Sequence, residues 1–343
     1  MPSAVRFPGD HGRRMRGLLL TFLVLFIVVI DAGTAAPVHS VSNSPWADAG
    51  KARITSEKKI SERVRDLTIS SPAVGKSVPV RIILPKSWYA RKNATFPVLY
   101  MLHGGDDDYT SWTRETDIEE LSDQADFLIV MPDGGRHGYY SDWRIGTPLW
   151  ETFHTAELIR LMESKYRANT TRAVAGLSMG GLGALNYAAR HRGMFKYAAA
   201  MSSYVDLDEP AVRLALLLGA DRDGVDIKDV WGDPRRDVAN WRSHNPSAMP
   251  EAFRGTRVHL SVGSGRPGPS DLNRRLDTVI VGAVAERALP ESVEKFASSL
   301  RRSGVRTTTH FYDPGTHSWP YWQSELHRIW PTVSAVLDRR VVR

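Results

Sequence analysis

The chain has 343 residues, of which 42% are hydrophobic and 24% are charged, and these proportions exclude wholesale disorder. Its 27 Gly and 20 Pro follow no period, which excludes collagen-like and low-complexity architectures, and the lack of cysteine excludes disulfides and thiolate chemistry. The formal net charge of +7 comes from dispersed Lys and Arg residues, so nucleic-acid binding is not expected.

Residues 1–36 have the pattern of a secretory signal peptide. Arg13, Arg14 and Arg16 precede an apolar run at 17–30, and small residues follow at 32–36. This order of zones is typical of secretory signals, and the run is shorter than the roughly 20 residues that a spanning helix needs. An uncleaved N-terminal anchor is the alternative. We expect a secreted or cell-envelope protein with a polar linker at 37–56 and a single domain at 57–343.

Strand and helix patterns alternate along that domain. Predicted strands lie at 78–84, 96–102, 127–131, 171–177, 197–201, 258–262 and 308–312, and predicted helices lie at 118–126, 150–166, 181–191, 210–218, 291–302 and 322–337, the last with a kink at Pro331. Several strands are apolar throughout, as strands buried on both faces are. This rhythm predicts an α/β fold with a mostly parallel central sheet and helices on both faces. The ligand site is then expected at the carboxyl ends of the strands, with residues 203–249 as an insertion near it.

A Gly-x-Ser-x-Gly pattern stands where a predicted strand meets a predicted helix. Ser178 is its central residue, between Gly176 and Gly180. In the nucleophile elbow of α/β-hydrolases, small flanking residues allow a strained turn that exposes the serine hydroxyl. The backbone N–H of Met179 would then face a developing oxyanion. The alternative is a glycine-rich packing turn with a helix-capping serine.

A serine nucleophile needs an imidazole base. In this fold the base follows the last strand, which points to His317 after the strand at 308–312. His103 also stands at a strand end but precedes the elbow. His310 lies within a strand and His154 on a helix, where structural roles are expected.

The acid that orients the imidazole should lie between the serine and the histidine in the chain. Asp271 follows the strand at 258–262, and Glu286 lies further on. Spacing alone leaves both open, and for each the alternative is a salt-bridged carboxylate at the surface.

Several segments resemble the antigen 85 mycolyltransferases and, more broadly, the esterase-D-type α/β-hydrolases that contain them. They are residues 101–112, 133–135, 141–143, 150–153, 176–181 and 315–322, and the last, Gly-Thr-His-Ser-Trp-Pro-Tyr-Trp, is very specific. The likeness extends from about residue 78 to 330. It implies the α/β-hydrolase fold, and it favours Glu286 as the acid because in the family a glutamate precedes a helix that carries a phenylalanine, here Phe296. It also implies the Gly105 backbone N–H as the second oxyanion donor.

One segment departs from that family. Antigen 85 enzymes have Asp-Gly-Leu-Arg after the second strand, and its aspartate and arginine help hold trehalose. This chain is shorter there and reads His103-Gly104-Gly105-Asp106, with no obvious replacement for the sugar-binding pair. We therefore expect acyl-ester chemistry rather than trehalose mycolylation, with His103 and Trp319 as substrate-binding candidates.

The sequence predicts a secreted serine esterase or acyltransferase that acts on lipid or sugar esters. Ser178, His317 and Glu286 would form an acyl-enzyme, with Gly105 and Met179 as the oxyanion hole and with no cofactor and no metal. The partners would be an acyl ester, a hydroxyl acceptor such as water, a sugar or glycerol, and lipid of the cell envelope. The resemblance implies two alternatives: an antigen 85-like mycolyl or diacylglycerol acyltransferase, and a non-catalytic glycan- or fibronectin-binding relative. The presence of all three triad candidates argues against the second.

Overall fold

The computed structural model describes residues 51–213, 216 and 224–338. The predicted signal peptide and most of the predicted linker lie outside these residues. The end of the linker prediction is wrong, because the first strand, β1, already begins at Arg53. The strand was not predicted because its sequence is mostly polar and lacks an apolar run; almost all of its residues are exposed.

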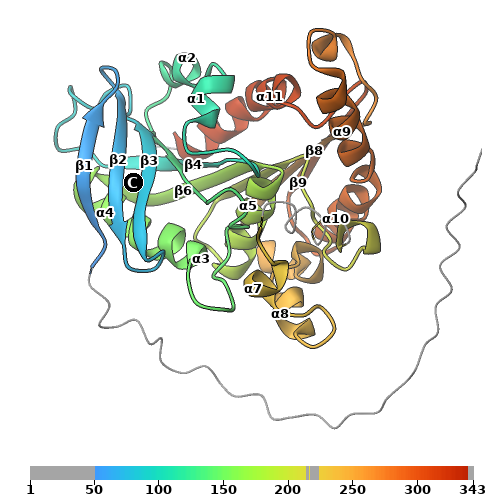
Figure 1. The fold of residues 1–343 in the computed structure, drawn as a ribbon. Helices are drawn as coiled ribbons and strands as arrows, with labels where there is room; N and C mark the ends of the chain where they lie inside the picture. The colour runs from blue at the N-terminus through green and yellow to red at the C-terminus, as the bar shows by residue number, and fades with distance from the viewer. Residues whose placement is uncertain (1–50, 214–215, 217–223, 339–343) are drawn as a thin grey trace, which may run out of the picture. The chain divides into compact units, whose positions relative to one another are not determined.

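A single nine-stranded sheet runs through the described residues, in the order β1-β2-β3-β5-β4-β6-β7-β8-β9 (Figure 1). The pairings from β1 to β5 along this order are antiparallel, and those from β5 to β9 are parallel. The strands are β1 Arg53–Lys59, β2 Val64–Ser71, β3 Lys76–Ile83, β4 Phe96–Leu102, β5 Leu128–Pro132, β6 Ala168–Leu177, β7 Tyr197–Met201, β8 Arg257–Gly263 and β9 Thr307–Tyr312. All seven predicted strands are confirmed, and the fold is the predicted α/β fold with a mostly parallel sheet.

Helices cover both faces of the sheet, as predicted. One face packs against α1 Ser111–Glu115, α2 Ile118–Ser122 and α11 Trp319–Leu337, which share a buried core with the strands. The other face packs against α4 Leu158–Lys165, α5 Met179–Arg190, α7 Ile227–Trp231, α8 Val238–Ser243 and α10 Pro290–Arg302. Strands β4, β5 and β7 are buried on both faces along almost their whole length, which explains their continuous apolar sequences.

The predicted helices differ from the observed ones in detail. The helix predicted at 150–166 is divided into α3 Trp150–Thr152, a π-helical turn at Phe153–Glu157 and α4. The helix predicted at 118–126 ends at Ser122, and the one predicted from 322 begins at Trp319 and continues through Pro331. The helix predicted at 210–218 falls partly outside the described residues. Prediction missed α9 Leu276–Arg287.

Candidate active site

Ser178 lies on a sharp turn between β6 and α5. Its backbone has φ 50° and ψ −119°, a conformation that a residue with a side chain rarely adopts. A Cβ on Gly176 would collide with the Gly180 carbonyl, and a Cβ on Gly180 would collide with the carbonyls of Leu102 and His103. The glycines of the motif therefore permit the turn. The Ser178 side chain makes no capping hydrogen bond to α5, so the helix-cap alternative is wrong.

His317 follows β9, and its imidazole is fixed from two sides. Nδ1 lies 2.8 Å from Glu286 Oε2, and the ring packs edge-on against Trp322 with centroids 4.9 Å apart. The His317 backbone N–H donates to the Gly282 carbonyl at 3.2 Å. Because Nδ1 faces a carboxylate, it carries the proton, which leaves Nε2 as the basic nitrogen.

Glu286 is fully buried near the end of α9. Its Oε2 faces His317, and its Oε1 accepts hydrogen bonds from Ser202 Oγ at 2.7 Å and the Gly263 N–H at 2.6 Å. Ser202 Oγ in turn accepts from Trp322 Nε1 at 2.9 Å. Of the two carboxylates that spacing left open, Glu286 is the one that contacts His317.

A continuous path of contacts joins Ser178 to this histidine. The Ser178 N–H donates to the Met201 carbonyl at 2.9 Å, and the next residue, Ser202, binds Glu286. Ser178, Ser202 and the residues around His317 follow β6, β7 and β9, and Gly263 ends β8; these four strands are parallel neighbours. The residues therefore lie at the carboxyl ends of the strands, where such folds bind ligands.

The two backbone groups expected to hold an oxyanion lie beside the serine. Met179 is the first residue of α5, so its N–H has no partner within the helix. Gly104 and Gly105 follow β4, and a Cβ on Gly104 would lie 3.6 Å from Ser178 Cβ. Within the described residues, the Gly105 N–H makes no hydrogen bond.

The expectation that His103 binds substrate does not fit the structure. The ring is buried, Nδ1 donates to the Gly104 carbonyl at 2.7 Å, and Nε2 accepts from the Gly134 N–H at 2.9 Å. Both nitrogens are thus occupied by backbone groups. His103 fixes the loop that carries Gly104 and Gly105 and leaves no ring nitrogen for a ligand.

Trp319 lies half-buried at the start of α11. Its ring packs edge-on against Trp112, with centroids 5.2 Å apart, and against Trp322, at 5.3 Å. Because Trp322 also contacts His317, Trp319 belongs to the aromatic group behind the imidazole. Its contact with substrate stays a prediction.

Asp271 is neither the partner of His317 nor a surface carboxylate. It is buried, and its oxygens accept hydrogen bonds from Thr316 Oγ1 and Tyr321 Oη, each at 2.8 Å, and from the Gly268 N–H at 2.9 Å. Spacing suggested neither the burial nor these partners, because the two hydroxyls lie 45 and 50 residues further along the chain.

Two other histidines have structural surroundings, as expected. His310 Nδ1 lies 2.6 Å from the carboxylate of the buried Glu325. His154 Nδ1 lies 2.8 Å from Tyr187 Oη, and its Nε2 lies 2.9 Å from the Asp133 carbonyl.

A carboxylate and a guanidinium do meet beside Gly105, although the sequence offered no obvious pair. Asp106 has φ 60° and forms an ion pair with Arg136. His137 lies next to both, with Nε2 3.3 Å from Asp106 Oδ1 and its ring beside Gly105. Sequence reasoning missed the pair because Arg136 follows a different strand, 30 residues away. The loop after β4 therefore presents charge next to the expected oxyanion site.

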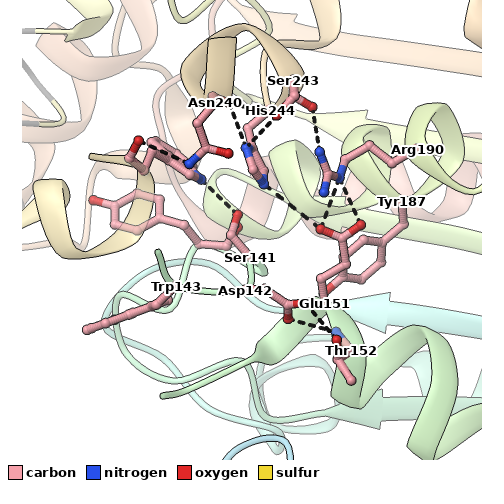
Figure 2. Close-up of polar contacts among 12 residues, drawn as sticks. Ser141, Asp142, Trp143, Glu151, Thr152, Tyr187, Arg190, Asn240, Ser243 and His244 are labelled. Atoms are coloured by element: carbon pink, nitrogen blue, oxygen red, sulfur yellow. Dashed lines mark hydrogen bonds and ion pairs between the residues drawn. The ribbon is translucent and has the colours of Figure 1, made fainter. Parts of the chain in front are cut away.

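The segments Ser141-Asp142-Trp143 and Glu151-Thr152 hold neighbouring parts of the fold together (Figure 2). Asp142 accepts hydrogen bonds from the Thr152 N–H at 2.8 Å and from its hydroxyl at 2.6 Å. Trp231 Nε1 on α7 donates to Ser141 Oγ at 3.0 Å. These residues connect α3 to the insertion.

The described residues contain no group of three or more His, Cys, Asp or Glu side chains arranged to hold a metal ion. Within the same residues, no helix is both long and apolar enough to cross a membrane.

The fold and the arrangement of these side chains define an α/β-hydrolase. The Esterase family model matches residues 71–333, and the chain belongs to this family. It is 31% identical over 290 residues to the diacylglycerol acyltransferase/mycolyltransferase Ag85A of Mycobacterium tuberculosis, covering 80% of this chain and 81% of that protein. It is 32% identical over 275 residues to the esterase Rv1288 of the same species, covering 77% of this chain and 58% of that protein.

Solved structures show the same fold. Mycobacterium tuberculosis MPT51 (FbpC1) superposes with a TM-score of 0.68 at 22% identity, covering 81% of this chain and all of that one. The S-formylglutathione hydrolase of Agrobacterium tumefaciens gives 0.62 at 17% identity, covering 83% and 99%. With the sequence relatives, these matches make the protein an esterase or acyltransferase that hydrolyses or transfers acyl esters, and they confirm the antigen 85-like resemblance.

Proposed function

We propose that the protein is a secreted serine esterase or acyltransferase with Ser178 as nucleophile, His317 as general base and Glu286 as the orienting acid. The observation that carries this proposal is the 2.8 Å contact between His317 Nδ1 and the buried Glu286 carboxylate. A buried carboxylate in this position stabilises the imidazolium that forms when the histidine takes a proton. The same contact fixes the tautomer in which Nε2 is the base.

In the first half-reaction, Ser178 Oγ attacks the ester carbonyl carbon and passes its proton to His317 Nε2. The backbone N–H groups of Gly105 and Met179 donate to the oxygen that becomes negatively charged. The C–O bond of the ester then breaks, and the leaving alcohol takes the proton from His317. The product is an acyl-enzyme on Ser178.

In the second half-reaction, water or an alcohol attacks the acyl carbon and gives its proton to His317. The bond between the acyl carbon and Ser178 Oγ then breaks, Ser178 Oγ takes the proton back from His317, and the carboxylic acid or the new ester leaves. The exposed Asp106–Arg136 ion pair lies beside Gly105 and offers polar contacts to a hydroxylated acceptor, so a sugar or glycerol acceptor fits this side of the site. Export rests on the signal pattern at residues 1–36.

Ser178→Ala tests the proposal. Loss of a triad serine costs on the order of a million-fold in turnover, so hydrolysis of p-nitrophenyl esters and labelling by a fluorophosphonate should both collapse in the folded variant. Ser324→Ala is the matched control, because Ser324 is exposed on α11 and bonds only its own helix, and it should leave both rates unchanged. Near-normal turnover by Ser178→Ala would refute the assignment. An unlabelled wild-type protein would support a non-catalytic binding role instead.

A further inference from the structure

Asp271 is a buried carboxylate outside the proposed triad. It ends a short 3-10 turn, Pro269–Asp271, in the loop between β8 and α9, and only 5% of its surface is exposed. Oδ1 accepts from Thr316 Oγ1, and Oδ2 accepts from Tyr321 Oη and the Gly268 N–H. Burying a carboxylate costs free energy unless its hydrogen bonds are satisfied, so the role of Asp271 is to be sought among its hydrogen-bond partners.

The two hydroxyls that bind Asp271 stand on either side of His317. Thr316 immediately precedes the histidine, and Tyr321 lies in the first turn of α11. Thr316 donates its single proton to the carboxylate, so the contact of 3.1 Å between Thr316 Oγ1 and Ser318 Oγ is one in which Ser318 donates. The residues before and after the imidazole are thus both connected to Asp271.

Main-chain contacts join the same two loops. We call residues 313–318 the His317 loop. The Gly265 N–H donates to the Gly315 carbonyl at 2.8 Å, and the Gly315 N–H donates to the Arg266 carbonyl at 2.9 Å. A Cβ on Gly268 would collide with Pro314, so the loops pack with no room between them.

A carboxylate suits this position better than an amide. Three donors converge on it, two O–H groups and one N–H group, and only an ionised carboxylate presents acceptors alone. Burial opposes ionisation, but the hydrogen bonds from Gly268, Thr316 and Tyr321 outweigh it and lower the pKa of Asp271. Burial and the neighbouring Asp271 carboxylate raise the pKa of Tyr321 to about 12, so its hydroxyl stays a donor at neutral pH.

We propose that Asp271 is a positioning residue that holds the His317 loop so that the imidazole faces Glu286 and Ser178 together. The proposal rests on the proposed function, because it acts through the base assigned there. Glu286 orients the ring through Nδ1, whereas Asp271 fixes the backbone from which the ring projects. In the general triad, one carboxylate orients the histidine. Here two carboxylates between the serine and the histidine share the positioning of the imidazole: Glu286 orients the ring, and Asp271 holds its backbone.

Asp271→Asn tests this role. The amide turns an N–H₂ group toward one of three donors, so the loop should shift and turnover should fall. Misplacing a catalytic group by about 1 Å can lower the rate on the order of a hundredfold. We therefore expect kcat to fall by roughly 10- to 100-fold. KM should change by less than about twofold, because the base acts in the chemical step. Fluorophosphonate labelling should slow in the same ratio as kcat.

Two companion variants make the result specific. Asp277→Asn is the matched control, since Asp277 is exposed and its side chain contacts Arg275 and its own helix start, and its kcat should stay within about twofold. Tyr321→Phe removes a single hydroxyl from the Asp271 site and should reproduce part of the kcat loss. It keeps the test decisive if Asp271→Asn fails to fold.

Coupling to the triad separates positioning from simple stability. In a Glu286→Gln background the imidazole is already misoriented, so adding Asp271→Asn should cost less than about threefold, because residues that act as a unit are not additive. The proposal fails if Asp271→Asn and Tyr321→Phe lower the melting temperature but leave kcat unchanged. It also fails if the full loss persists in the Glu286→Gln background, or if only KM rises. Retained activity in Ser178→Ala would instead refute the proposed function, independently of Asp271.

Discussion

Two serines in the site have backbone conformations that usually belong to glycine. Ser178 has φ 50° and Ser202 has φ 49°, and each such residue costs on the order of 1–3 kcal/mol. The Gly-x-Ser-x-Gly motif predicted the first. Nothing in the sequence marked the second, because its partners, Glu286 and Trp322, lie 84 and 120 residues away. A sequence motif thus predicts a strained residue when the neighbouring residues in the chain produce the strain. It does not predict one whose contacts are made by residues distant in the chain.

Ser202→Ala should impair both the site and the fold. The Glu286 carboxylate would lose one donor, and the buried Trp322 N–H would lose its acceptor. An unpaired buried group of this kind costs about 1–3 kcal/mol, so the free energy of unfolding should fall by that amount. We expect kcat to fall about tenfold, as each 1.36 kcal/mol of lost transition-state stabilisation costs a factor of ten.

Ser261→Ala is the control for that experiment. Ser261 is buried next to Ser202, and its carbonyl accepts the Ser202 N–H at 2.8 Å, yet its own hydroxyl has no partner within the described residues. Removing it should change the free energy of unfolding by less than about 0.5 kcal/mol and leave kcat unaltered. Equal effects of the two substitutions in urea unfolding and ester hydrolysis would contradict the role given to Ser202.

At the scale of elements, the sequence predicted the strands that are buried on both faces and missed two strands at one edge of the sheet. Strands β4, β5 and β7 have continuous apolar runs, whereas β1 is almost wholly exposed and β2 is buried on alternate residues. Helix α9 escaped prediction for a different reason. It exposes Leu276, Ile280 and Val284, so its apolar residues do not lie on the buried face alone and show no helical period.

One buried carboxylate connects three helices that are far apart in the chain. Glu151 on α3 accepts a hydrogen bond from Arg190 Nε at 2.8 Å, near the end of α5 (Figure 2). It accepts another from His191 Nε2, also at 2.8 Å. Arg190 also donates to the Ser243 carbonyl on α8 at 2.9 Å. Burial opposes ionisation of Glu151, but its bond to His191 and the charge of Arg190 lower its pKa to about 2. These contacts connect α8 of the insertion to α3 and α5.

Glu151→Gln should destabilise the protein without altering the chemistry. Removing one partner of a buried ion pair costs about 3–5 kcal/mol, since the remaining charge is left uncompensated. Urea unfolding should show a loss of that size, with kcat per folded molecule preserved. Glu291→Gln, which breaks the exposed pair with Lys295, should change stability by less than about 0.5 kcal/mol. A loss of activity that exceeds the unfolded fraction would place Glu151 in the site.

At the scale of the whole molecule, the alternation of strands and helices was enough to predict the mostly parallel sheet. Parallel strands bring their carboxyl ends to one edge, so the sequence already predicted that Ser178 and His317 lie at the same edge. The choice between Asp271 and Glu286 required the resemblance, and the second role of Asp271 required the structure. Such roles depend on contacts between residues that are distant in the chain, and these contacts cannot be predicted from the spacing of residues in a single sequence.

Mild acid should destabilise the folded chain through two buried histidines. Burial lowers the pKa of both His154 and His244 to about 4, whereas an imidazole in the unfolded chain titrates near 6.5. Between these values the unfolded chain binds protons that the folded chain excludes, so the free energy of unfolding falls as the pH falls from about 6.5 toward 4. Each histidine contributes on the order of 3 kcal/mol to that fall, at 1.36 kcal/mol per pKa unit.

His244→Gln isolates one of the two contributions. Its Nδ1 lies 2.8 Å from the Asn240 carbonyl, a bond that a glutamine amide can replace without taking up a proton. Urea unfolding between about pH 7 and 5 stays above the range in which an unfolded glutamate protonates, near 4.3, so Glu151 does not contribute to the slope. Over this range the variant should lose about half of the pH dependence shown by the wild-type protein, because His154 still titrates. A wild-type free energy of unfolding that stays constant from pH 7 to 5 would show that neither imidazole is held neutral by burial.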